Sequence, residues 1–152
     1  MEETIYDRID NLAVSEDTKK VLKELVERKE KADNWKKTLQ ALSLVNAGIV
    51  LILFLWMLKI KPDSKAQIFD MISYFGSSRA SLLFIMLAVS TFFISGSVSK
   101  THKKHKDKYD DLREETVTRL YSTWKVREES KLRDEVSDLL KKEKDINLRY
   151  VK

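Results

Sequence analysis

The sequence predicts an all-α membrane protein: a two-transmembrane helical hairpin with long charged cytoplasmic helices at both ends. The main support is a pair of stretches without any charged residue, Thr38 to Leu58 and Ala80 to Ser99, in a chain of which 35% is charged. A hydrocarbon core of about 30 Å is crossed by about 20 helical residues, so both stretches are long enough. Two buried helices of a soluble four-helix core are the alternative, but such helices usually carry charged residues along one side.

The N-terminal segment, residues 1–37, is expected to start loosely and then to form a cytoplasmic helix. Ser15 is suited to be its N-cap, and Glu16 and Asp17 follow in the first turn, where the helix dipole favours acidic residues. No glycine or proline occurs between Ser15 and the middle of the first apolar stretch. We therefore expect one unbroken helix to lead from Ser15 into transmembrane helix 1, residues 38–58.

The extracytoplasmic connector, residues 59–79, contains the single proline of the chain, Pro62. Its sequence QIFDMISYF fits either a short amphipathic helix in the outer headgroup layer or an ordered loop. The apolar residues with helical spacing in this sequence are Ile68, Phe69, Ile72 and Phe75. Transmembrane helix 2 follows the connector, at residues 80–99.

The cytoplasmic tail, residues 100–152, is basic at first and then carries two apolar stripes at helical spacing. The first stripe is Tyr109, Leu112, Thr116, Leu120 and Trp124, and the second is Leu132, Val136 and Leu139. Such stripes need a partner surface. An antiparallel hairpin would pack residues 18–34, with a stripe of their own, alongside residues 104–125, and self-association of two copies is equally allowed.

The distribution of lysine and arginine predicts the orientation, because these residues are enriched in cytoplasmic loops. Residues 19–38 contain eight of them and residues 100–119 contain seven, whereas residues 59–79 contain four. This predicts a multi-pass protein of the cell (inner) membrane with both termini cytoplasmic. The first apolar stretch is too long and begins too late for a cleaved signal peptide, so we expect it to be retained.

Lysines gather at the predicted cytoplasmic ends of both spans. Basic residues close to a membrane surface attract anionic lipid headgroups, by about 1 kcal/mol each. The predicted headgroup contacts are Lys36, Lys37, Lys100, Lys103, Lys104 and Lys106. We expect no nucleic-acid binding, because no aromatic residues alternate with the lysines. His102 and His105 lie three apart on one helix face and could form half of a metal site. No third ligand is indicated, so we expect no metal and interpret both histidines as solvated interfacial residues.

Small and hydroxyl residues indicate how the two spans pack, because close approach and interhelical hydrogen bonds drive association in lipid. The predicted packing residues are Ser43, Asn46, Ala47, Thr91, Ser95 and Ser99. Counted from the cytoplasmic ends, Ser43 should lie level with Ser95, and Ala47 level with Thr91. Asn46 is interpreted as an interhelical hydrogen-bonding residue rather than as an ion or substrate contact.

The sequence carries no recognised catalytic pattern. Three glycines in the whole chain leave no phosphate-binding loop, and the absence of cysteine removes thiolate chemistry. Most carboxylates alternate with lysines and arginines, as in solvated helices with i, i+4 ion pairs. We therefore expect no enzyme activity and no cofactor.

Two flanking segments, RKEKADNWKK before the first span and KEKDINLRY near the C-terminus, give the chain a family likeness. With the two spans between them, it resembles the small YpbF-like membrane proteins of spore-forming Gram-positive bacteria. That resemblance implies a multi-pass cell-membrane protein and carries over no catalytic or binding residue. We expect a non-enzymatic protein whose cytoplasmic helices mediate homo-oligomerisation or dock a partner protein. The alternative is a pore-forming or holin-like effector.

Overall fold

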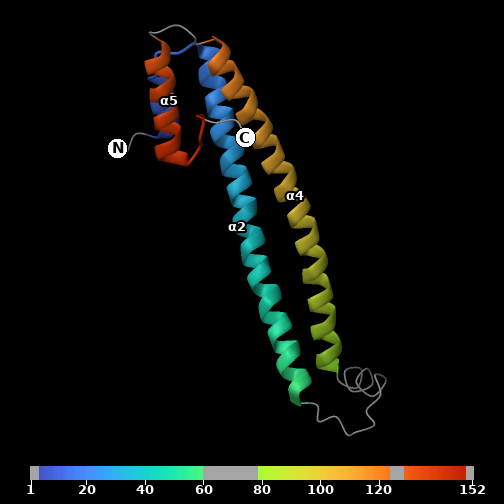
Figure 1. The fold of residues 1–152 in the computed structure, drawn as a ribbon. Coiled ribbons are helices and arrows are strands. Elements are labelled where there is room, and N and C mark those ends of the chain that lie inside the picture. The colour runs from blue at the N-terminus through green and yellow to red at the C-terminus, as the bar shows by residue number, and fades with distance from the viewer. Residues whose placement is uncertain (1–3, 60–78, 124–128, 150–152) are drawn as a thin grey trace. The chain divides into compact units, whose positions relative to one another are not determined.

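The structure is a computed structural model that describes residues 4–59, 79–123 and 129–149. Four helices occupy these ranges: α1 (Ile5–Asp10), α2 (Glu16–Lys59), α4 (Arg79–Thr123) and α5 (Glu129–Lys144) (Figure 1). The all-helical prediction is thereby confirmed, and no strand occurs among the described residues. The connector segment Ile68–Phe75, expected to be either a short amphipathic helix or an ordered loop, and the stripe residue Trp124 lie outside the described ranges.

Helix α2 begins as its sequence predicts and then continues without a break for 44 residues. Ser15 acts as its N-cap, because the Ser15 Oγ accepts a hydrogen bond from the backbone N–H of Thr18 at 3.3 Å. The following turn contains Glu16 and Asp17. At 1.5 Å per residue, a helix of this length extends for about 66 Å. The expected continuous helix from Ser15 into the first apolar stretch is confirmed.

The loose N-terminal start is a wrong expectation, because residues 5–10 form the short helix α1. A capping box begins this helix: the Thr4 hydroxyl accepts from the Asp7 N–H, and the Asp7 carboxylate accepts from the Thr4 N–H. The side-chain hydrogen bond with Thr4 also lowers the pKa of Asp7. The pattern Thr4-x-x-Asp7 is the sequence signal that predicts such a start.

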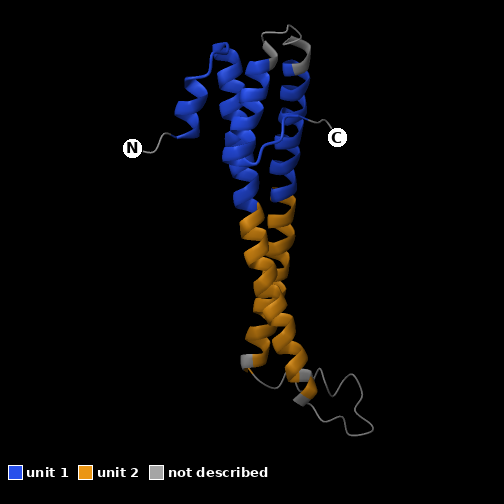
Figure 2. Ribbon diagram, turned by 60° about the vertical axis from the view of Figure 1, so that its left-hand side comes forward, with its two compact units in different colours: residues 1–35, 102–152 blue, residues 36–101 orange. Residues whose placement is uncertain are grey.

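The chain divides into two compact units (Figure 2). We call residues 1–35 and 102–152 the helical head, and residues 36–101 the apolar helix pair. Helices α2 and α4 each contribute to both units. The predicted boundaries of the charged segments, residues 37 and 100, lie within two residues of this division.

The helical head has its own hydrophobic core, to which α1, α2, α4 and α5 all contribute. The fully buried side chains in it are Ile9, Leu22, Leu25, Val26, Val117, Val136, Leu140 and Ile146. The two tail stripes and the N-terminal stripe therefore cover one another within a single chain, as the intramolecular hairpin predicts. Ile146 and Leu148, which follow α5, are also buried there and were not expected to be.

In the apolar helix pair, α2 and α4 run antiparallel and face each other through alternating steps of three and four residues. On α2 the buried or half-buried positions of this face are Leu42, Asn46, Ile49, Leu53 and Trp56. On α4 they are Phe84, Ala88, Thr91, Ser95 and Val98. This 3–4 alternation keeps one seam of each helix facing its partner, as in a coiled coil.

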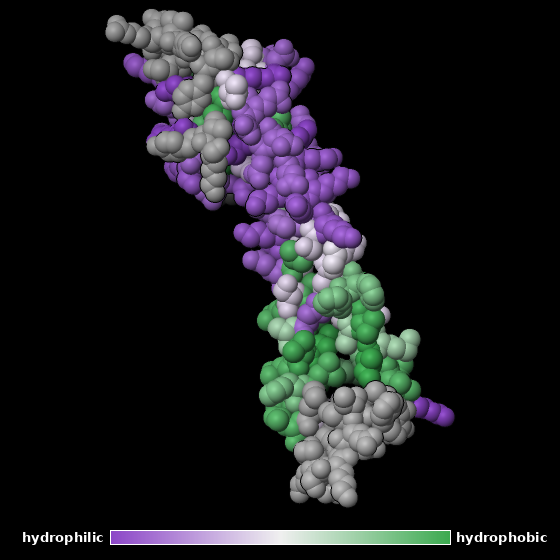
Figure 3. Space-filling model, turned by 45° about the vertical axis from the view of Figure 1, so that its right-hand side comes forward, coloured by the Kyte–Doolittle hydropathy of each residue, from purple (hydrophilic) through white to green (hydrophobic). Residues whose placement is uncertain are grey.

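Most other side chains of the apolar helix pair are exposed and hydrophobic. Figure 3 shows hydrophobic residues over this pair and hydrophilic residues over the helical head. Both α2 and α4 are long and apolar enough to cross a membrane, and only 6% of the most apolar stretch of each is buried. Neither stretch is therefore a core helix buried within this chain.

Candidate functional site

A hydrogen-bonded polar pair joins the two apolar helices. The Asn46 Nδ2 donates to the Ser95 Oγ at 2.6 Å, and the Ser95 Oγ donates to the backbone carbonyl of Thr91 at 2.8 Å. The serine hydroxyl thus acts as acceptor and donor at once, which its one proton and two lone pairs allow. Further along the pair, the Trp56 and Phe84 rings meet edge to face with centroids 6.1 Å apart. This arrangement holds two helices together in a fixed register.

The other predicted packing residues divide into two groups. Thr91 is half-buried on the contact face, whereas Ser43, Ala47 and Ser99 are exposed. Ser95 contacts Asn46, which comes three residues after Ser43, the residue expected to lie level with it. Helix geometry explains why a stripe with a fixed spacing of four residues does not stay on the contact face. At 3.6 residues per turn, each step of four rotates about 40° away from that face. The alternating steps Thr91–Ser95–Val98 stay on that face, and the fixed step from Ser95 to Ser99 leaves it.

The six predicted headgroup lysines are all exposed: Lys36, Lys37, Lys100, Lys103, Lys104 and Lys106. Within the described ranges, none of the six forms an ion pair. Other lysines behave differently: Lys23 pairs with Asp10 at 2.6 Å, and Lys31 pairs with Glu27 at 2.5 Å. Each long helix therefore presents uncompensated ammonium groups just outside its apolar stretch, where an anion can bind them.

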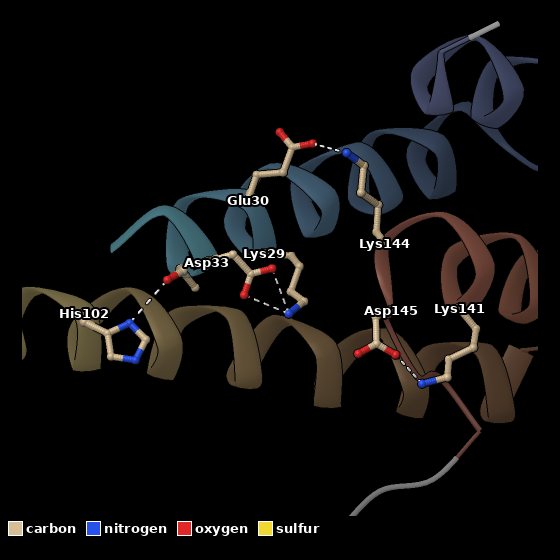
Figure 4. Close-up of polar contacts among 8 residues, drawn as sticks. Lys29, Glu30, Asp33, His102, Lys141, Lys144 and Asp145 are labelled. Carbon is tan, nitrogen blue, oxygen red and sulfur yellow. Dashed lines mark hydrogen bonds and ion pairs between the residues drawn. The ribbon is translucent and has the colours of Figure 1, made fainter. Parts of the chain in front are cut away.

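His102 and His105 are half-buried and contact α2, so they are less solvated than expected. The His102 Nδ1 lies 3.2 Å from the carbonyl oxygen of Ala32, and Figure 4 shows this ring pointing from α4 toward α2. The His105 ring stacks on Trp35, with centroids 6.1 Å apart and planes 11° apart. Among the residues that the structure describes, no group of three or more possible ligands is placed to hold a metal ion.

Polar contacts fasten α5 and the following segment to the rest of the helical head. The Lys144 Nζ lies 2.5 Å from the Glu30 carboxylate (Figure 4), and this hydrogen bond raises the pKa of Lys144. Arg8 pairs with Glu143 at 2.5 Å. The Arg113 Nε donates to the Asn147 carbonyl at 2.5 Å. Sequence reasoning missed these contacts because their partners are far apart along the chain, whereas the predicted i, i+4 pairs, such as Lys29–Asp33, are present.

Tyr109 is a half-buried titratable group of the head. Burial raises its pKa from the ordinary value of 10.0 to about 12, because the phenolate would lose its hydration. The Lys29 Nζ lies 5.7 Å from the centre of the Tyr109 ring, within the range of a cation–π contact. We assign this phenol a packing role.

A shallow hollow lies between α1 and α5. Its lining is largely charged and includes the ion-paired Arg8 and Asp138. The complete lining is Arg8, Asn11, Leu12, Glu135, Asp138, Leu139 and Lys142. We interpret this hollow as a depression in the surface of the head and assign no chemistry to it.

Comparison with known protein families gave a match over most of the chain. The model of a family described as "Protein of unknown function (DUF2663)" matches residues 21–151. The matched region begins within α2, at residue 21, and includes the rest of that helix together with α4 and α5. Neither the search of curated proteins nor that of solved structures found a match.

Proposed function

We propose that this chain, which belongs to the DUF2663 family of proteins of unknown function, is a non-enzymatic two-span membrane protein. Its helical head would lie in the cytoplasm and mediate oligomerisation or dock a partner protein. The single observation that carries the membrane assignment is the exposure of the apolar helix pair.

Sixteen large hydrophobic side chains are exposed among the described residues, and all lie between Leu44 and Ile94. Two of the most exposed are Leu44 at 76% and Phe92 at 74%. Soluble monomers rarely expose contiguous apolar patches of more than a few hundred Å². A lipid bilayer covers such a surface without any partner protein, and the backbone of both helices is already hydrogen-bonded internally, as lipid requires.

The lysines give this proposal its orientation. Lys36, Lys37 and the lysines at 100–106 are exposed and unpaired, as is appropriate for contact with anionic headgroups on the cytoplasmic side. Both termini would then be cytoplasmic and the connector extracytoplasmic, in the cell (inner) membrane. The resemblance to YpbF-like membrane proteins supports the same location.

The surface of the head limits how it can bind another molecule. Within its described residues no large apolar side chain is exposed, because the stripes are buried in its own core. Oligomerisation or docking through the described surface of the head would therefore use charged and polar side chains. Contacts of that kind weaken as ionic strength rises, since salt screens exposed charges.

Crosslinking of lysines in native membranes, followed by mass spectrometry, tests the role of the head. Lys20, Lys131 and Lys142 are exposed lysines of the head and would supply the informative links. Co-expression of isotopically light and heavy chains separates links between copies from links within one copy. We expect links from the head to a second copy or to another protein, and fewer at high salt. Links confined to single chains would contradict the proposed role.

A further inference from the structure

One face of α4, at the C-terminal end of its apolar stretch, carries an apolar residue, a glycine and two residues that can donate hydrogen bonds. In the sequence FISGSVSK, Phe93, Gly96, Ser97 and Lys100 are spaced i, i+3, i+4 and i+7, so they lie on the same face. All four are exposed, and Phe93 is 73% exposed. The face that contacts α2 is a different one and carries Ser95.

Gly96 has no packing role among the residues that the structure describes. A Cβ atom added at this position would meet nothing within 4 Å. A glycine inside a helix costs about 1 kcal/mol relative to alanine. Gly96 leaves the backbone of this turn uncovered on the outward side, between the ring of Phe93 and the ammonium group of Lys100.

The hydroxyl groups of this part of α4 differ in whether they have a hydrogen-bond partner. Those of Ser90, Thr91 and Ser95 donate to carbonyl groups four residues earlier on the same helix. The Ser97 hydroxyl has no hydrogen-bond partner among the described residues, and Lys100 forms no ion pair with any of them. Ser97 and Lys100 therefore offer two free donors within one helical turn.

We propose that this face binds one anionic glycerophospholipid, with Ser97 and Lys100 as donors to its phosphate. An acyl chain lies along Phe93 and against the uncovered backbone at Gly96, while the phosphate accepts from the Ser97 hydroxyl and the Lys100 ammonium group. Hydrogen bonds of this kind, in which the donor, the acceptor or both are ionised, are about twice as strong as neutral ones. A headgroup with its own ammonium group is repelled by Lys100, so the site selects lipids of net negative charge.

This inference rests on the proposed membrane location but goes beyond it. Attraction of headgroups by a lysine cluster is diffuse and depends only on the number of charges. A defined site depends also on the open backbone at Gly96 and on the Ser97 hydroxyl, which carry no charge. Substitutions at Gly96 and Ser97 that leave the charge unchanged therefore distinguish a defined site from diffuse attraction.

The test is native mass spectrometry of the full-length protein, purified in detergent, with an equimolar mixture of phosphatidylglycerol and phosphatidylethanolamine. We expect one phosphatidylglycerol per chain in the wild type. Gly96→Ile keeps every charge but fills the open space, and Ser97→Ala removes only the hydroxyl; both should lower the bound fraction. Lys100→Gln removes a charged hydrogen bond and should weaken binding about tenfold or more.

Two control variants match these changes. Gly48→Ile fills an equally open position on α2, with no lysine one turn away, and should bind lipid like the wild type. Lys36→Gln removes the same charge as Lys100→Gln but away from this face, so it should cost only diffuse attraction and weaken binding clearly less than Lys100→Gln. Circular dichroism of each variant verifies that its helices form.

Equal binding by Gly96→Ile and the wild type, or equal losses in Lys36→Gln and Lys100→Gln, would overturn the site in favour of diffuse attraction. A membrane-extracted wild type that binds both lipids equally would also overturn it, while leaving the membrane proposal intact. A wild type recovered as a soluble particle without detergent would instead refute the membrane proposal itself.

Discussion

Removal of the Asn46–Ser95 hydrogen bond is the perturbation that isolates the packing of the two apolar helices. The Asn46 Nδ2 donates to the Ser95 Oγ at 2.6 Å, and the Ser95 Oγ donates in turn to the Thr91 carbonyl. The two single variants therefore leave different groups behind. Asn46→Ala leaves a serine hydroxyl that keeps its bond to Thr91, whereas Ser95→Ala leaves the Asn46 amide without its acceptor.

The free-energy costs follow from this asymmetry. A hydrogen bond lost without leaving an unsatisfied group costs about 0.5–1.5 kcal/mol, and a buried donor left without a partner costs about 1–3 kcal/mol. Ser95→Ala should therefore destabilise the protein more than Asn46→Ala. The double variant leaves no amide behind, so its cost should fall below the sum of the single costs. Interhelical hydrogen bonds in lipid give couplings that average about 0.6 kcal/mol, with a maximum near 1.7 kcal/mol.

The assay is a double-mutant cycle on the full-length protein, unfolded in mixed micelles and followed by tryptophan fluorescence. A parallel cysteine experiment reads the register directly, because the natural chain has no cysteine. Cysteines at 46 and 95 should form a disulfide faster than cysteines at 43 and 95. A coupling below about 0.3 kcal/mol, the usual limit of additivity for independent sites, would refute this account of the pair. Faster crosslinking from position 43 would do so as well.

Three further outcomes are expected in the helical head and its surroundings. Leu140→Ala should cost about 2–5 kcal/mol in chemical denaturation, because this side chain is fully buried, whereas exposed Leu44→Ala should cost far less. Burial raises the pKa of Tyr109 to about 12, so the stabilising contribution of its protonated phenol is complete below pH 10 and is lost as pH rises toward 12. Phenolate absorbance and the free energy of unfolding should both show this pH dependence, and Tyr109→Phe should abolish it. A double-mutant cycle on Glu30 and Lys144, both partly exposed to solvent, should give a coupling of about 1 kcal/mol that falls with salt.

The sequence predicts the long helices well because their determinants are local. The lack of charge from Thr38 to Leu58 and from Ala80 to Ser99, and the N-cap at Ser15, depend on neighbouring residues alone. The i, i+4 ion pairs are predictable for the same reason. Helix α1 was missed although its signal is local too: the capping box of Thr4 and Asp7 begins a helix of only six residues.

The residues that face each other across the apolar pair were predicted less well. Small residues recur every four positions, as at Thr91, Ser95 and Ser99, and suggest a stripe that the geometry of the helix does not maintain. The register depends on which side chain meets Ser95, and it is Asn46, on the contact face, instead of the exposed Ser43. The contacts of α5 with Glu30 and the burial of Ile146 depend on tertiary folding, for which the local pattern carries no signal.

The most direct test of the central claim is the accessibility of single cysteines on either side of the two apolar stretches. Lys20→Cys, Lys65→Cys and Lys142→Cys place one thiol each in a chain that has none. If both helices cross the bilayer with their termini in the cytoplasm, a membrane-impermeant maleimide will label only position 65 in intact cells, and all three after permeabilisation. Protection of position 65 together with the other two in intact cells would contradict a two-span membrane protein of this orientation.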